Sequence, residues 1–299
     1  MRMTKHRPTN RLFLILAATI MAVAATALAD TEAAKTAYNE GIKMAQEGDT
    51  AAAIVSYKGA IAKDPTYADA YLNLGAIYFA QKEYDQAVST YQNATEQAPK
   101  NAAAWSNLGR VQFALRKYQD ARAAFEQALT LNPSDAELYK DLGKVLYYSK
   151  DWKTLIQTMN KAHQMDAGDA MTYYMVGKAH QKLGQDNEAI AAFKKAAEAD
   201  PEYYNAHSSL GQIYLAQEKY GSAASAYKKA MQTKPSSYNA AYNYAIAVES
   251  NDPENYQQSI DVWSNFVKKA KGNPQAKEKL AIAEQHIKDL EEALKASKL

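Results

Sequence analysis

A 34-residue period between Ala68 and Asp135 limits what this chain can fold into more than any other feature of its sequence. Residues 68–101 and 102–135 align without a gap. The two rows carry the same residue, or another aromatic residue, at nine matching positions: Tyr71/Trp105, Leu74/Leu108, Gly75/Gly109, Phe79/Phe113, Tyr84/Tyr118, Ala87/Ala121, Tyr91/Phe125, Ala94/Ala128 and Pro99/Pro133. A fixed period of this length is typical of architectures that repeat one supersecondary unit.

The apolar spacing within each row predicts two helices joined by a turn. In the row 102–135 we expect a first helix over about 102–115 and a second over about 119–131, because apolar residues recur there at helical spacing. Gly109 and Ala121 carry little or no side chain, which allows the paired helices to approach closely. Pro133 ends the second helix. One hairpin cannot bury its own apolar face, so the rows are expected to stack into a solenoid.

The same pattern continues on both sides of this stretch. Rows are predicted at 34–67, 136–169, 170–203 and 204–237, with a degenerate seventh row at 238–271. The first row lacks the Leu-Gly pair, as expected of an end cap. In the second half of row 136–169, Leu155, Met159 and Ala167 replace the small residue, the aromatic and the proline. Together with the first residues of the mature chain these rows define a predicted solenoid over 30–273.

A final helix is expected over about 275–296, after the turn at Gly272-Asn273-Pro274. It carries an apolar stripe at spacings of three and four, formed by Leu280, Ala283, Ile287, Leu290 and Leu294. We interpret residues 274–299 as a capping helix that covers the last pair. A coiled-coil seam of two to three heptads is the alternative.

The order aromatic, Leu-Gly, Ala, aromatic, Ala, Pro at a period of 34 resembles the tetratricopeptide repeat (TPR) family. The resemblance implies an all-α fold, a right-handed superhelical solenoid of about seven stacked antiparallel helix pairs. It also implies a non-catalytic scaffold for protein interactions. In TPR proteins of this type, first-helix residues at row positions two, five, six, nine and twelve line the concave groove.

The first 29 residues have the layout of a secretory signal peptide. A basic start, with Arg2 and Arg11 among its residues, precedes an uncharged run that ends in Ala27-Leu28-Ala29. We expect cleavage after Ala29, which makes the protein periplasmic or secreted and leaves it without a membrane segment. A retained membrane anchor is the alternative, since the apolar run is about long enough to span a bilayer.

Charge and motif content narrow the function. The full chain has a net charge of +2, and the leader holds four basic and no acidic residues, so the mature chain is close to neutral at −2. Such a balance argues against nucleic acid as the main partner. The chain has no cysteine, and His163, His180, His207 and His286 match no metal or catalytic spacing. We therefore predict no enzyme activity, no cofactor and no metal site, and we expect His207 to be a core or half-buried residue.

Position six of the rows carries a polar series that we predict to line the groove. It includes Asn39, Asn73, Asn107 and Asp141, followed by Met175, Ser209 and Asn243. An asparagine amide both donates and accepts hydrogen bonds, so a series of them could bind the backbone of an extended peptide. The alternative is that these asparagines only bond the neighbouring repeat.

Position nine and the neighbouring positions complete the predicted site. Arg110, Lys144 and Lys178 at position nine favour an acidic partner segment, unless Asp141 and Glu137 neutralise them. Aromatic and methionine side chains beside them are candidate contacts, although such residues are more often core: Phe79, Phe113, Tyr147, Tyr174, Met171 and Met175.

The favoured function is a protein-interaction scaffold of the cell envelope that binds a peptide or helix in this groove. One alternative is an accessory protein for envelope polysaccharide export or remodelling that contacts glycan. Another is a structural spacer that self-associates weakly through the final helix.

Overall fold

The computed structural model describes residues 30–298, and the predicted signal peptide lies outside this range. Every regular element of the described residues is a helix, so the predicted all-α class is confirmed. The chain divides into two compact units, Met1–Val145 and Leu146–Leu299. Each unit is described separately below.

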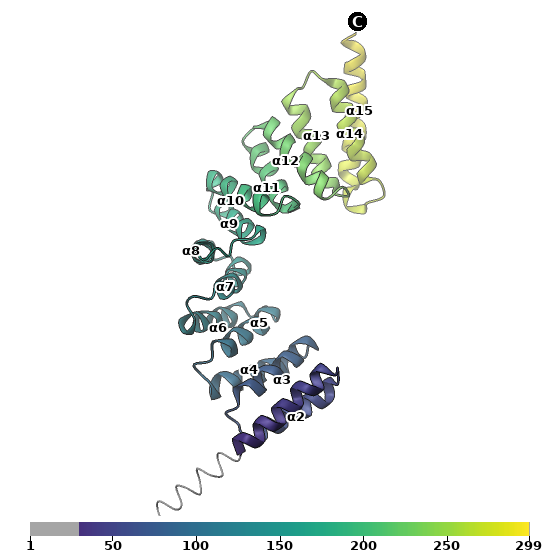
Figure 1. The fold of residues 1–299 in the computed structure, drawn as a ribbon. Helices are drawn as coiled ribbons and strands as arrows, with labels where there is room; N and C mark the ends of the chain where they lie inside the picture. The colour runs from purple at the N-terminus through teal and green to yellow at the C-terminus, as the bar shows by residue number, and fades with distance from the viewer. Residues whose placement is uncertain (1–29, 299) are drawn as a thin grey trace, which may run out of the picture. The chain divides into compact units, whose positions relative to one another are not determined.

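The first unit is a stack of helix hairpins. Helical residues 30–46 come first, and the elements that follow are α2 (Thr50–Lys63), α3 (Ala68–Ala80), α4 (Tyr84–Gln97), α5 (Ala102–Ala114), α6 (Tyr118–Leu131) and α7 (Ala136–Tyr148), which ends in the second unit. Successive helices from α2 to α6 pack against each other, and α3 also contacts α5 (Figure 1). The bounds of α5 and α6 agree with the two helices expected in row 102–135.

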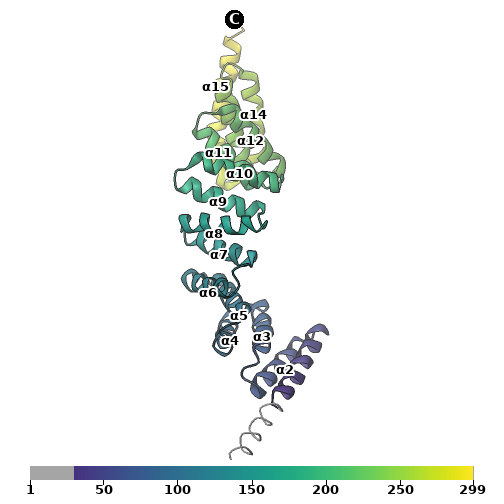
Figure 2. The same cartoon turned by 60° about the vertical axis from the view of Figure 1, so that its left-hand side comes forward.

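The second unit continues the hairpin pattern and ends in a single long helix. Its elements are α8 (Trp152–Gln164), α9 (Ala170–Lys182), α10 (Asp186–Ala199), α11 (Tyr204–Ala216), α12 (Tyr220–Thr233), α13 (Tyr238–Asn251), α14 (Tyr256–Ala270), the 3-10 turn η1 (Pro274–Ala276) and α15 (Lys277–Ala296). From α8 onward each helix packs on the next along the chain (Figure 2). The first helix α11 also contacts both α9 and α13.

A glycine on five of the first helices faces an aromatic ring on its partner helix. A Cβ atom built on Gly75 would lie 2.7 Å from the ring of Tyr91, and one on Gly177 would lie 2.5 Å from Phe193. The same contact recurs at Gly41/Tyr57, Gly109/Phe125 and Gly211/Tyr227. The rings are buried, so the glycines set how closely the two helices approach.

The second helix of row 136–169 has no aromatic ring at this contact, as its sequence indicated. Leu155 and Met159 on α8 are both fully buried. These two apolar side chains therefore form the buried face of this helix, where most other rows have an alanine and an aromatic ring. Row seven also differs, because α14 begins two residues late and Trp263 supplies the buried ring, packed with Ala245 and Phe266.

The turn inside most hairpins contains one residue in the left-handed backbone region. Gly48 and Gly184 occupy this place in two rows, whereas Lys82, Arg116, Lys150 and Glu218 occupy it in four others with φ between 56° and 62°. Only glycine adopts this conformation without cost. The four non-glycine turns therefore carry backbone strain that their sequence did not reveal.

Helix α15 covers the last pair, which confirms the predicted capping helix. Its apolar stripe faces inward: Ala283 and Leu290 are buried in a cluster with Trp263 and Phe266 of α14, and Leu280 and Ile287 pack on that cluster. His286 adds a polar contact, with its Nε2 atom 2.9 Å from both carboxylate oxygens of Glu249 on α13. The Trp263 indole donates to the same carboxylate at 2.7 Å.

Candidate binding surface on the first helices

Two of the predicted asparagines connect neighbouring repeats. Asn73 Nδ2 donates to the hydroxyl oxygens of Tyr38 at 3.1 Å and Tyr57 at 3.4 Å, both in the preceding row. Asn243 Nδ2 donates to the Tyr227 hydroxyl at 3.2 Å in the same way. These amides hold the buried ring of one hairpin against the first helix of the next. They still have their carbonyl oxygens to offer a ligand.

The other residues at position six have different surroundings. Asn39 is exposed, whereas Met175 and Ser209 are buried in the second unit. Asn107 is half-buried, and its carbonyl oxygen accepts from Arg110 at 3.5 Å. The predicted series of asparagines is therefore not uniform along the rows.

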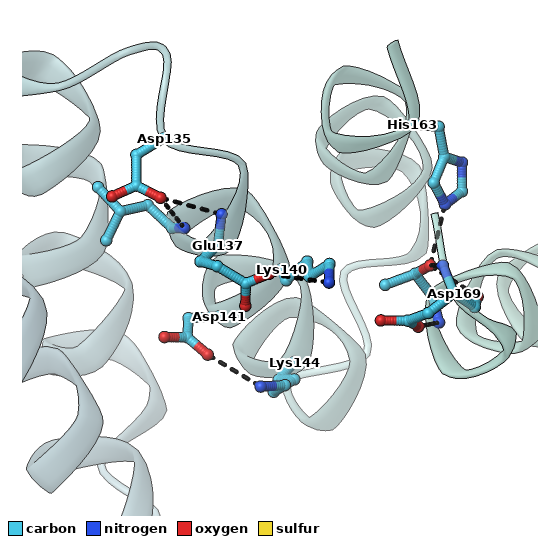
Figure 3. A network of polar contacts seen from close by, with 9 residues as sticks. Asp135, Glu137, Lys140, Asp141, Lys144, His163 and Asp169 are labelled. Atoms are coloured by element: carbon cyan, nitrogen blue, oxygen red, sulfur yellow. Dashed lines mark hydrogen bonds and ion pairs between the residues drawn. The ribbon is translucent and has the colours of Figure 1, made fainter. Parts of the chain in front are cut away.

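Asp141 joins two of the predicted cations in the first unit. Its carboxylate accepts from Arg110 Nε at 2.8 Å and from Lys144 Nζ at 2.9 Å, and its side chain is only 13% exposed. Figure 3 shows Lys144 directed at Asp141, while Glu137 pairs with Lys140 on the same helix. Two cations share one carboxylate, so this cluster keeps one net positive charge. Glu137 takes no part in its neutralisation.

Lys178 in the second unit has no such partner. It is half-buried on α9 and donates to Gln181 Oε1 at 2.6 Å, and no carboxylate of the described residues pairs with it. Burial lowers its pKa, and the nearby positive charge of Lys182 lowers it further. A half-buried cation without a counter-ion gains stability when an anion binds beside it.

Three tyrosines of the second unit, Tyr147, Tyr174 and Tyr203, lie close together. Burial raises the pKa of Tyr174 to about 12, and the neighbouring phenol groups of Tyr147 and Tyr203 contribute to the rise. The Tyr174 ring meets the Tyr203 ring at 5.6 Å in an edge-on contact. Sequence reasoning found Tyr147, Tyr174 and Ser209 but missed Tyr203, which is the last residue of its row.

The remaining predicted contacts divide between core and surface. Phe79 is 37% exposed and packs on Tyr84, and Phe113 packs on Tyr118 in the same way one row later. Met175 is 5% exposed and belongs to the core, whereas Met171 is 51% exposed. Of the two methionines, Met171 is thus the one that a ligand can contact.

The four histidines of the described chain have structural contacts. His163 bonds the hydroxyl of Thr172 at 3.1 Å next to the capping box that Asp169 forms with Thr172 (Figure 3). His207 is half-buried and bonds the Pro201 carbonyl oxygen at 2.8 Å, in agreement with its expected role. Between residues 30 and 298, no group of three or more His, Asp or Glu side chains is arranged to hold a metal ion.

Stacked hairpins of this kind define a class of helical-repeat interaction scaffolds, which bind partners on extended surfaces. Tetratricopeptide repeat models match residues 44–111 and 78–145, and another matches 174–238. Together they cover more than half of the chain, so the protein belongs to the tetratricopeptide repeat family. Repeats of this family typically act as scaffolds without catalysis.

Solved structures agree with this assignment. A crystal structure of MamA shares 28% identity with a TM-score of 0.51, over 54% of this chain and 94% of that one. The C-terminal part of a TPR repeat-containing protein from Cytophaga hutchinsonii shares 18% identity and reaches 0.66, over 81% and 98%. YrrB, described as a TPR protein with an unusual peptide-binding site, shares 24% identity and reaches 0.56, over 62% and 95%. At the identities of the last two, the likeness shows the fold alone. A search of curated proteins found no match.

Proposed function

We propose that this protein is an exported scaffold that binds an acidic segment of a partner protein on its first-helix surface. The observation that carries the proposal is Lys178, a half-buried cation on α9 without a carboxylate partner in the described chain. An acidic side chain of a ligand would supply the missing counter-ion. Exposed Met171, two turns earlier on the same helix, offers an adaptable apolar contact beside it.

The first unit contributes a second favourable place for an anion. Arg110 and Lys144 share the carboxylate of Asp141, and their side chains are 47% and 39% exposed. The remaining positive charge supports the same partner chemistry. Export is inferred from the leader sequence alone. Within residues 30–298, no helix is long and apolar enough to cross a membrane.

Charge reversal tests the proposal directly. Candidate partners are captured from the exported protein fraction, their binding segments are mapped as peptides, and peptide affinity is measured by fluorescence anisotropy at low salt. Lys178→Glu should weaken binding of an acidic peptide at least about tenfold, equivalent to about 1.4 kcal/mol. The matched control is Lys194→Glu on the exposed side of α10, which should change affinity less than about twofold. Equal losses in both variants, or no loss in either, would contradict the proposal.

Contact with an envelope glycan is a second candidate, favoured by the tyrosine cluster. Tyr147, Tyr174 and Tyr203 bring aromatic rings and hydroxyls together, and such groups stack on and bond sugars. Binding to a glycan array that Tyr147→Ala removes, with acidic-peptide binding unchanged, would favour this function instead.

A further inference from the structure

A small polar hollow lies between α12 and α14, the second helices of rows six and seven, away from the surface described above. It has a volume of about 340 Å³ and is bounded by α12, α13 and α14. Its α13 wall consists of Tyr244, Val248 and Asn251, at row positions seven, eleven and fourteen. At 100° per residue, these positions point to the opposite side of the helix from positions two, five, nine and twelve. The hollow is therefore a separate site from the proposed partner surface.

The irregular turn of row seven shapes this hollow. Helix α13 extends to Asn251, and α14 begins only at Tyr256, whereas the helices of the other rows are separated by fewer residues. The longer helix places the Asn251 amide over Gly221 at the start of α12. A Cβ atom at residue 221 would lie 3.1 Å from Asn251 Oδ1, so glycine provides the room for this approach.

The walls present polar groups that the protein itself does not use. Ser225, Lys228, Tyr244 and Asn251 line the hollow, and their side chains make no hydrogen bond or ion pair within the described residues. Gln258 adds a side-chain amide, whose carbonyl oxygen also accepts from Asn255 Nδ2 at 3.2 Å. None of the lining residues is acidic, so Lys228 has no counter-ion there. Ala224 and the buried Val248 complete the lining with apolar surface.

We propose that this hollow binds a carboxylate-bearing sugar, a hexuronate unit. Lys228 would pair with the carboxylate. The amides of Asn251 and Gln258 and the Ser225 hydroxyl both donate and accept, which matches the hydroxyl groups of a sugar ring. The Tyr244 ring supplies the aromatic surface on which sugar faces pack. A phosphate or a dicarboxylate would call for more than one cation, whereas Lys228 is the one cation of the described lining. The volume of the hollow lies at the small end of the range of about 300–1,000 Å³ for ligand sites, which suits a single sugar unit.

The test uses the purified full chain with sodium glucuronate, and with glucose and acetate as probes of each half of the chemistry. Affinities are measured by calorimetry, and contacts by saturation-transfer NMR. Glucuronate should bind about fivefold more tightly than either comparison compound, the effect expected of one exposed ion pair combined with the ring contacts. No detectable glucuronate binding, or equal affinity for glucose, would overturn the assignment.

Two neighbouring lysines provide a matched control. Lys228→Gln should remove the preference for glucuronate over glucose, while Lys228→Arg should keep it because the charge remains. Lys229→Gln changes an exposed lysine that does not line the hollow and should leave both affinities within about twofold of the original. Equal losses from Lys228→Gln and Lys229→Gln would show a non-specific charge effect and refute the site. Far-UV circular dichroism confirms that each variant is folded.

Discussion

Replacing Gly75 by alanine tests whether close packing of glycine against an aromatic ring holds the hairpins together. The new Cβ atom would lie 2.7 Å from the ring of Tyr91, which is only 3% exposed and has little room to move. In an unconstrained helix, glycine to alanine would stabilise by about 1 kcal/mol. Overpacking a close-packed core costs about 1–3 kcal/mol. We therefore expect a net destabilisation of about 1 kcal/mol for Gly75→Ala.

The same unit offers a matched control. Gly59 lies inside α2, and a Cβ atom built there meets nothing within 4 Å. Gly59→Ala should therefore stabilise by about 0.5–1 kcal/mol, the helix-propensity term alone. The two variants carry the same chemical change and are expected to have opposite signs.

Urea unfolding followed by circular dichroism at 222 nm measures both variants. Because repeat proteins can unfold in more than one step, midpoints are compared together with slopes. A Tyr91→Leu background removes the ring, so Gly75→Ala should cost at least about 1 kcal/mol less there than in the original chain. If Gly75→Ala stabilises as much as Gly59→Ala does, the packing argument is wrong.

Three further predictions concern turns, pH and the capping helix. Glu218→Gly removes a strained left-handed residue (φ 56°) and should stabilise by about 0.5–1 kcal/mol in thermal melts, whereas an equal loss would contradict the strain argument. Burial raises the pKa of Tyr91 and Tyr227 from 10.0 to about 12. The unfolded chain releases these protons first, so stability is intact below pH 10 and falls towards pH 12 by up to about 1.4 kcal/mol per pH unit for each tyrosine. Tyr91→Phe should reduce that slope in urea titrations, and an unchanged slope would refute the assignment. His286→Ala leaves Glu249 with one fewer hydrogen bond and should expose α15 to faster amide exchange by about fivefold, with exchange in α9 as the unaffected reference.

The helices and their core were predictable because the repeat places one type of residue at each structural role. Row 102–135 alone indicated α5 and α6, and the apolar stripe on α15 indicated which side would face α14. The left-handed turn residues were missed because Lys82 and Glu218 are not residues that signal this conformation.

The site was harder to predict, since it depends on contacts between rows. The repeat predicted that Asn73 lies on the first helix of its row, but the bonds from its amide to Tyr38 and Tyr57 of the preceding row depend on how the rows stack. Likewise, Asp141 and Glu137 were both considered as partners for the cations at position nine. Asp141 does pair with two of them, whereas Glu137 pairs with Lys140 instead. A period identifies equivalent positions, but long polar side chains at those positions choose among several neighbours.

Site-specific photocrosslinking tests the central claim, that partners bind the first-helix surface, most directly. A photoreactive phenylalanine analogue replaces exposed Met171 on α9 in one variant and exposed Lys194 on α10 in another, and each is irradiated with the partner peptide bound. We expect crosslinks from residue 171 and essentially none from residue 194. Efficient crosslinking from residue 194 with none from residue 171 would contradict that claim.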